Sequence, residues 1–387
     1  MSSNQYDQLF ESFTFKSGVS IDNRIVMAPM TSESSFENGM VTTDELNYFA
    51  RHSKSAGMII TSCAQFLENG RFSGSLGVSS DTQIEGLRKL ANTVKKDGSK
   101  AILQIFHVGR MGSAATLKGE QPVSASTVPS NRPAAEIPRA LSDEEVRDAV
   151  TAFGESVRRA IQAGFDGIEI HGANTYLIQQ FFSPHSNRRE DQWGGNIEKR
   201  MTFPMEIIKI TEKMVEQYAE TPFVIGYRLS PEELENPGIT LSDTLKLMQK
   251  ISETKVDYIH VSLGDYKKTS IRDTASKTPV LKLIKEHLGD AIPLIGVGKV
   301  LHPDDALDMM EMGIPLVAIG RALIMEPDWL EKVRTDRLDE IRTEISLKKL
   351  DDLVLPAKMV EYIQSPAGWL NIKEQPKGGS RFKELTM

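Results

Sequence analysis

The chain alternates between short apolar runs and longer segments in which apolar residues recur with helical spacing. Eight runs are rich in β-branched and other apolar residues and too short for typical helices. They lie at residues 25–28, 58–61, 101–106, 167–170, 223–227, 258–261, 292–297 and 316–319. Mostly continuous apolar runs are typical of parallel strands that helices cover. We therefore predict eight parallel strands.

Amphipathic helices are predicted between these strands, most clearly over residues 142–163. Apolar residues recur there at spacings of three or four, which places them on one face: Val146, Val150, Phe153, Val157 and Ile161. Ser142 and Glu145 have the spacing of a capping box, in which each side chain accepts from the backbone N–H of the other residue. Pro303 predicts the start of another helix after the seventh strand.

A glycine separates several helical patterns from the next strand, where a left-handed residue would end the helix. These glycines are Gly57, Gly98, Gly164, Gly289 and Gly313. The repeat of strand, helix and glycine favours a closed α/β (β/α)₈ TIM barrel over an open doubly wound sheet, which more often has fewer strands. The barrel core is predicted at about residues 22–330.

The remaining segments extend the barrel, so that residues 1–387 are expected to form a single domain. Residues 1–24 predict a small N-terminal hairpin that closes the bottom of the barrel, and residues 330–376 a C-terminal helical extension. The polar tail 377–387 is expected to be mobile. The Pro- and Ser-rich stretch 121–139 is a long loop of the kind that covers a site.

Composition narrows the possible functions. The 387 residues are 40% hydrophobic and 26% charged with a net charge of −7, and no basic run predicts binding to nucleic acid. Cys63 is the only cysteine, which excludes an internal disulfide or a Cys-based metal cluster and fits a reducing compartment. Neither an export signal nor an apolar run of membrane-spanning length is present. We expect a cytoplasmic protein without membrane contact and leave homo-oligomerisation open.

Polar residues gather where the apolar runs end, which is the end of a barrel that carries its active site. Gly296 and Gly298 follow the seventh run, and Gly320 and Arg321 follow the eighth. Glycines at these positions commonly form a phosphate site with exposed backbone N–H groups. Tight turns are the alternative explanation for these glycines.

The fourth run leads into His171, Asn174 and Tyr176. His171 and Asn174 are spaced to direct N–H donors at one oxygen, which suits a carbonyl, nitro or phenolate group. Tyr176 can give and accept a proton. Each residue alone would more often be structural, and only the cluster favours catalysis. Glu169 and His171 share one side of the strand, but no metal-binding motif surrounds them, so we expect no metal.

These residues resemble the signature of the Old Yellow Enzyme family of FMN-dependent ene-reductases, over about residues 7–345. The resemblance lies in the 171–178 and 182–195 segments, with Trp193 where the family usually has Tyr. Further family blocks occur in the right order: Asn23 to Thr31, Gln104 with His107, Gly109 with Arg110, Gly296 with Gly298, and Gly320 with Arg321.

The resemblance implies bound FMN, NADH or NADPH as the hydride donor, and a small-molecule acceptor with an activated C=C bond. Residues implied to line the flavin's pyrimidine side are Ala28, Pro29, Met30, Thr31, Cys63 and Gln104. Arg228 would lie near N1 and O2, and the glycines with Arg321 would hold the phosphate. In the implied ping-pong reaction, His171 and Asn174 bind the acceptor oxygen and Tyr176 supplies the proton.

Two departures concern the substrate pocket. Thr175 stands where relatives commonly have Gly, and Glu33 stands where one bacterial branch has an aromatic residue that lines the pocket. A charged residue at that place favours a polar substrate. Two alternatives are kept: a phosphate-binding aldolase or isomerase with Lys299 as a Schiff-base residue, and a flavin-binding redox sensor.

Overall fold

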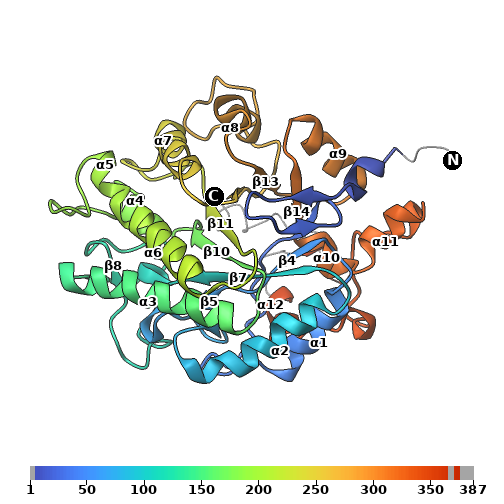
Figure 1. The fold of residues 1–387 in the computed structure, drawn as a ribbon, viewed down its shortest axis with the longest axis horizontal. Coiled ribbons are helices and arrows are strands. Elements are labelled where there is room, and N and C mark those ends of the chain that lie inside the picture. Colours follow the sequence, from blue (N-terminus) through green and yellow to red (C-terminus); the bar gives the residue numbers. More distant parts are fainter. Residues whose placement is uncertain (1–4, 365–369, 375–387) are drawn as a thin grey trace.

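The computed structural model describes residues 5–364 and 370–374, and at its centre eight parallel strands form a closed barrel (Figure 1). The strands are β3 (Ile25–Met27), β4 (Met58–Ile60), β7 (Lys100–Phe106), β10 (Gly167–Gly172), β11 (Val224–Leu229), β12 (Tyr258–Val261), β13 (Leu294–Val297) and β14 (Leu316–Ile319). Strand β10 pairs with both β7 and β11, which closes the barrel. The predicted (β/α)₈ fold is confirmed.

Two strands continue further at their C-terminal ends than predicted. Strand β10 continues to Gly172 and β11 to Leu229, so that His171 and Arg228 lie within strands and pair with each other in the parallel register. The prediction placed His171 after its strand and ended the next strand at Arg228. The predicted strands ended too early because a polar residue was taken as the end of an apolar run. His171 and Arg228 are polar but face the interior of the barrel and continue their strands.

Helices surround the barrel (Figure 1). Those following the strands are α1 (Thr43–His52), α2 (Ile84–Lys95), α3 (Asp143–Gln162), α6 (Thr202–Tyr218), α7 (Leu241–Ser252), α8 (Val280–Leu288), α9 (Pro303–Glu311) and α10 (Arg321–Met325). The capping box of α3 is confirmed: the Glu145 N–H donates to Ser142 Oγ at 3.1 Å, and the Ser142 N–H donates to Glu145 Oε2 at 2.8 Å. Pro303 begins α9 as predicted.

Four of the five predicted helix-ending glycines have positive φ: Gly98, Gly164, Gly289 and Gly313. Gly57 was wrongly explained, because it is absent from the positive-φ residues of the described chain. A Cβ atom at Gly57 would lie 2.9 Å from the Asn23 carbonyl oxygen, so close backbone approach requires glycine there.

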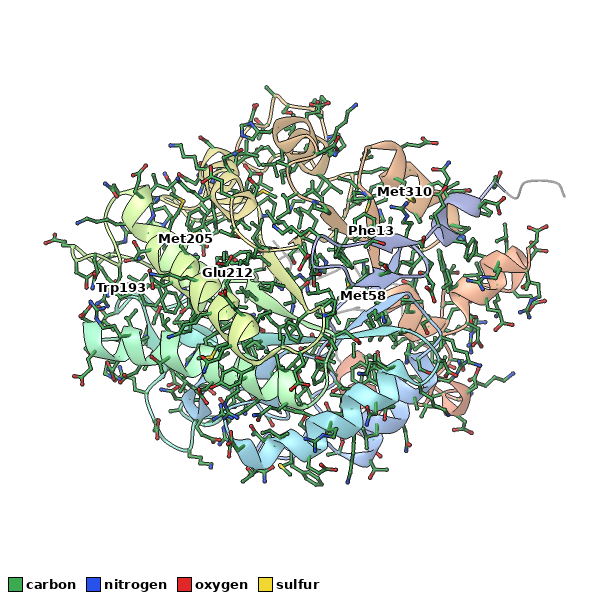
Figure 2. All side chains as sticks on the ribbon, in the orientation of Figure 1. Phe13, Met58, Trp193, Met205, Glu212 and Met310 are labelled. Atoms are coloured by element: carbon green, nitrogen blue, oxygen red, sulfur yellow. The ribbon has the colours of Figure 1, made fainter. Side chains whose placement is uncertain are left out.

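The predicted N-terminal hairpin is present and closes one end of the barrel. It consists of β1 (Phe13–Thr14) and β2 (Ser20–Ile21), which pair antiparallel. Phe15 packs in the same buried cluster as Met58, and its ring centroid lies 5.8 Å from that of Tyr258. In Figure 2, Phe13 and Met58 appear near the middle of the molecule, while Met205 and Glu212 mark the surrounding helix α6.

Short elements decorate this framework. They are η1 (Asp7–Phe10), β5 (Ala64–Gln65), η2 (Glu68–Gly70), β6 (Leu76–Gly77), η3 (Asp81–Gln83), η4 (Gly109–Met111), β8 (Val123–Ser124), β9 (Arg139–Ala140), α4 (Leu177–Phe182) and α5 (Ile197–Arg200). Strands β8 and β9 pair with each other and so join the two ends of the predicted long loop. No helix of the described residues is long and apolar enough to cross a membrane.

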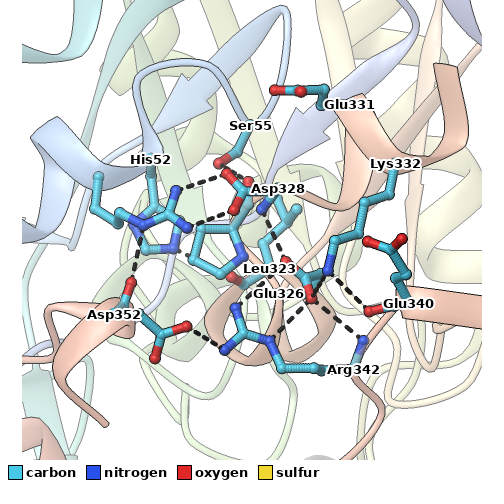
Figure 3. Close-up of polar contacts among 12 residues, drawn as sticks. His52, Ser55, Leu323, Glu326, Asp328, Glu331, Lys332, Glu340, Arg342 and Asp352 are labelled. Carbon is cyan, nitrogen blue, oxygen red and sulfur yellow. Dashed lines mark hydrogen bonds and ion pairs between the residues drawn. The ribbon is translucent and has the colours of Figure 1, made fainter. Parts of the chain in front are cut away.

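The C-terminal extension is less helical than predicted. It contains α11 (Trp329–Arg334), η5 (Leu338–Glu340), η6 (Asp351–Leu353) and α12 (Ala357–Ile363). Buried Glu326 anchors it, because its carboxylate accepts from Lys332 Nζ at 2.7 Å and from Arg342 Nε at 2.9 Å (Figure 3). The tail 377–387 lies outside the described residues. A single domain over 1–387 stays a prediction.

Candidate active site

A polar layer fills the barrel interior below the ends of the strands. At its centre is the fully buried Glu169, whose carboxylate accepts from Gln104 Nε2 at 2.7 Å, from the Tyr258 hydroxyl at 3.1 Å and from His260 Nδ1 at 2.9 Å. Burial opposes ionisation of Glu169, but His260 and Arg228 together with these hydrogen bonds lower its pKa. The interior therefore holds a negative charge directly beside Arg228.

Arg228 is a buried cation with a buried donor nitrogen that has no partner among the described residues. Its Nη2 donates to Ser262 Oγ at 3.1 Å, whereas its buried Nε has no hydrogen-bond partner in the described chain. Burial lowers the pKa of Arg228, but a guanidinium keeps its charge in proteins. An unsatisfied buried donor of this kind indicates a missing acceptor. The electron-rich pyrimidine edge of a flavin would supply one.

His171 presents an N–H donor at the end of β10. The Ala173 backbone N–H donates to His171 Nδ1 at 3.3 Å, so that Nδ1 is an acceptor and the proton of the neutral ring lies on Nε2. Burial lowers the pKa of His171 to about 3, and the ring therefore stays neutral at physiological pH. An acceptor oxygen would meet an N–H group rather than a charged imidazolium.

Asn174 and Thr175 form a left-handed turn after β10, with φ of +57° and +62°. Asparagine tolerates this region, whereas threonine does so only under strain. This geometry explains why glycine suits the position of Thr175. The Asn174 Oδ1 accepts from Ser262 Oγ at 3.0 Å, which leaves the two hydrogens of Nδ2 available to a ligand.

Tyr176 packs against His171 and Phe106 at the start of α4. Its ring meets that of His171 edge to face with centroids 4.9 Å apart, and it lies 5.2 Å from Phe106. Burial raises the pKa of Tyr176, and its hydroxyl makes no hydrogen bond to another residue described in the structure. The phenol therefore keeps its proton and is free to donate it.

The residues from Ala28 to Thr31 follow β3 at the same end of the barrel. The Ala28 N–H donates to the Ile319 carbonyl at 3.0 Å, while Pro29 and Met30 are partly exposed. Burial raises the pKa of Cys63 to about 12, and the neighbouring Thr31 offsets only part of this shift. The thiol is therefore protonated, and Cys63 offers packing and main-chain groups rather than a nucleophile.

Gly296 in β13 and Gly298 just after it are required for different structural reasons. A Cβ atom at Gly296 would point at the outer helices and lie 2.3 Å from Met309 Sδ, so helix packing alone requires this glycine. Gly298 has φ of +130°, and a Cβ atom there would lie 2.7 Å from the Asp265 nitrogen. Tight turning thus accounts for Gly298 as well, and phosphate binding by either glycine stays a prediction.

Arg321 follows Gly320 at the end of β14. Burial lowers its pKa, and its guanidinium forms no hydrogen bond or ion pair within the described residues. A partly buried cation without a partner favours binding of an anion. Arg228 and Arg321 together fit a ligand with one electron-rich ring edge and one phosphate, as FMN has.

Glu33 lies at the same end of the barrel, with φ of +52°. Burial raises its pKa, whereas Lys358 of the C-terminal extension lowers it. Burial raises the pKa of Tyr362 in α12, and the charge of Glu33 raises it further. Burial likewise raises the pKa of Tyr176, to which Tyr362 adds a smaller contribution. The C-terminal extension therefore borders the cluster around Tyr176.

The inward-facing residues of β12 and of the position after it were not among the predicted site residues. Tyr258, His260 and Ser262 alternate along the run Tyr-Ile-His-Val-Ser, and the period of two in a strand places them on one side. That alternation was the signal that could have found them. Among the described residues, no group of three or more His, Cys, Asp or Glu side chains is arranged to hold a metal ion.

Comparison with known proteins identifies the family. The model of the NADH:flavin oxidoreductase / NADH oxidase family matches residues 8–340. The chain belongs to this family, and the resemblance to Old Yellow Enzymes drawn from its motifs is confirmed. It is thus an NAD(P)H-dependent flavin oxidoreductase with FMN as its cofactor.

Its relatives include proteins of similar length and longer ones. A probable NADH-dependent flavin oxidoreductase of Bacillus subtilis, YqiG, is 43% identical over 96% of this chain and 99% of its own length. The NADH:acrylate oxidoreductase of Vibrio harveyi is 47% identical over 98% of this chain. That protein is much longer, and the match covers only 38% of its length. The structure of morphinone reductase superposes on this one with a TM-score of 0.74 and 25% sequence identity. The match covers 87% of this chain and 91% of the morphinone reductase chain.

The aldolase alternative is wrong, since the family consists of oxidoreductases. Lys299 is also unsuited to a Schiff base. Its side chain is 64% exposed, and its Nζ lies 3.4 Å from Asp265 Oδ2 in an ion pair. A Schiff-base lysine needs a desolvated site that lowers its pKa.

Proposed function

We propose that this flavin oxidoreductase reduces the activated C=C bond of α,β-unsaturated carbonyl compounds or of related nitro and quinone acceptors. The observation that carries the proposal is that His171 and Asn174 each keep an N–H donor free at the end of β10. In both residues a neighbouring group occupies the acceptor atom and leaves an N–H donor free. Two fixed donors of this kind stabilise the charge that grows on an acceptor oxygen during reduction.

The other residues of the site have separate tasks. The bound flavin supplies a two-electron centre that accepts hydride from NADH or NADPH and passes hydride to the acceptor. Tyr176 donates its proton to the α-carbon, since its raised pKa keeps it protonated and its hydroxyl is unengaged. Arg228 stabilises negative charge at the flavin's pyrimidine edge. The nicotinamide and the acceptor occupy the same place in turn, which predicts ping-pong kinetics.

The relatives guide the choice of acceptor. The protein of Vibrio harveyi is named for acrylate, an α,β-unsaturated carboxylate. Glu33 favours a polar substrate here, but in its ionised form it would repel the acrylate anion. Because this chain spans only 38% of that protein, the acrylate activity can reside in the remainder. Acrylate therefore belongs in the test beside an enone, a nitroalkene and a quinone.

Anaerobic spectroscopy tests the proposal. The FMN-loaded protein is first titrated with NADH or NADPH, which should bleach the oxidised flavin spectrum. Each acceptor is then added, and an effective one should restore the spectrum with stoichiometric formation of its reduced product. This product is the saturated compound for acrylate, the enone and the nitroalkene, and the hydroquinone for the quinone. A protein that binds no FMN would overturn the assignment of the site. A reduced flavin that neither acrylate, nor the enone, nor the nitroalkene reoxidises would overturn the C=C reductase function.

The partial match to the longer relative favours a second candidate function. In that protein the barrel is joined to further chain, so this barrel can act as the part that oxidises NADH and delivers electrons to a protein partner. A flavin-binding redox sensor would likewise act on a protein partner and not on a small-molecule acceptor. Steady turnover of NAD(P)H with a small acceptor alone supports the reductase, whereas turnover only with a protein acceptor supports this second function.

A further inference from the structure

Ser262 connects two residues of the site that come from different strands. It directly follows β12, and its hydroxyl lies 3.1 Å from Arg228 Nη2 on β11 and 3.0 Å from Asn174 Oδ1 after β10. These two hydrogen bonds form a continuous chain from the buried cation to the amide at the mouth of the barrel. Ser262 thus contacts both the flavin side and the acceptor side of the site.

The donors and acceptors of these two hydrogen bonds follow from the chemistry of the side chains. A guanidinium can only donate, so Ser262 Oγ accepts from Arg228 and has its single hydrogen left for Asn174 Oδ1. The opposite orientation of the amide would give Ser262 Oγ two donors and leave its hydroxyl hydrogen without an acceptor. The satisfied arrangement therefore turns Asn174 Nδ2 away from Ser262.

The Asn174 amide has little else to hold it. The residue is exposed, and its backbone N–H donates to Ser230 Oγ at 3.0 Å, which fixes the main chain but not the side chain. Within the described residues, Ser262 is the one hydrogen-bond partner of the amide group. Without that bond, the amide would rotate about its side-chain torsions and present either oxygen or nitrogen to a ligand.

We propose that Ser262 is a positioning residue that holds the Asn174 amide with its N–H groups toward the acceptor oxygen. The charge-assisted bond from Arg228 polarises the hydroxyl and makes it a stronger donor to Asn174. Ser262 therefore couples the strength of acceptor binding to the buried cation. This inference rests on the proposed function, in which Asn174 binds the acceptor oxygen.

Binding of 4-nitrophenol to the oxidised, FMN-loaded protein tests the proposal without turnover. Its phenolate offers an anionic oxygen to the two donors, and its ionisation is visible as colour. We expect Ser262→Ala to weaken binding on the order of tenfold and to raise the apparent pKa of the bound phenol. Ser262→Thr retains a hydroxyl and should bind like the parent. Ser262→Cys, with a weak donor of similar volume, replaces Ser262→Ala should that variant not bind FMN.

A double-mutant cycle separates positioning from a general structural role. If Ser262 acts through Asn174, Ser262→Ala causes no further loss in an Asn174→Ala protein. Losses that add, or a Ser262→Ala protein that binds 4-nitrophenol like the parent, overturn the proposal. If Asn174→Ala alone leaves binding unchanged, the failure lies in the proposed function, because Asn174 then does not hold the oxygen.

Discussion

The rings of His171 and Tyr176 meet edge to face with their centroids 4.9 Å apart, at an interplanar angle of 76°. The contact brings a neutral N–H donor and a protonated phenol to one place, although the two residues lie on different elements. One can bind an oxygen while the other protonates a neighbouring carbon.

Tyr176→Phe should slow acceptor reduction by about 10²- to 10⁴-fold, the usual contribution of a general acid, because only the hydroxyl is lost. Reduction of the flavin by the nicotinamide should remain largely intact, since that step needs no proton from Tyr176. Stopped-flow absorbance of each half-reaction measures both rates. Tyr48→Phe removes a buried hydroxyl outside the site and is the matched control. Equal loss in both half-reactions would remove Tyr176 as the proton donor.

Thr175→Gly should stabilise the protein by about 0.5–1 kcal/mol. A non-glycine residue at φ of +62° is strained by about 1–2 kcal/mol, and the entropy lost by glycine on folding offsets part of the gain. Urea unfolding of the FMN-loaded variant gives the change in the free energy of unfolding. Thr175→Ala keeps the Cβ atom and should show no comparable gain. A less stable glycine variant would mean that Thr175 contributes contacts that outweigh its strain.

Glu326→Gln should destabilise the protein by about 3 kcal/mol, because it leaves Lys332 and Arg342 without their buried counter-charge. Burial opposes ionisation of Glu326, but hydrogen bonds from both cations lower its pKa. A lowered carboxyl pKa stabilises the fold above the ordinary value of about 4.3, and this stabilisation is lost as pH falls through the lowered pKa.

Urea unfolding at several pH values measures this contribution. The difference between the parent and Glu326→Gln should be complete at pH 7 and shrink below about pH 4. Glu331→Gln removes an exposed carboxylate nearby and should change the stability by less than about 1 kcal/mol. A difference that does not depend on pH would show that shape, not charge, accounts for the effect.

The sequence predicts the barrel well because each strand is an apolar run with its own turn and helix. The cluster of His171, Asn174 and Tyr176 could also be predicted, because the three residues lie within six consecutive positions of the sequence. The link through Ser262 could not be predicted from those residues, because it depends on three neighbouring strands. Arg51 and Asp328 form a bidentate ion pair across 277 residues, and no local pattern predicts such a contact.

The same limit applies to Glu169, which the sequence presented only as a neighbour of His171. Glu169→Gln should raise the midpoint potential of the bound flavin. The carboxylate partly neutralises Arg228, and its removal strengthens the positive potential that favours reduced, anionic flavin. We expect a rise on the order of 30 mV, equivalent to about 1.4 kcal/mol for a two-electron couple.

Anaerobic reductive titration followed by absorbance gives the potential. Glutamine also brings two donors to a place where three groups already donate, so the variant should lose about 1–3 kcal/mol of stability. Glu326→Gln neutralises a buried carboxylate outside the barrel interior and is the control that should leave the potential unchanged. An unchanged potential in Glu169→Gln would show that the charge of Glu169 does not reach the flavin through Arg228.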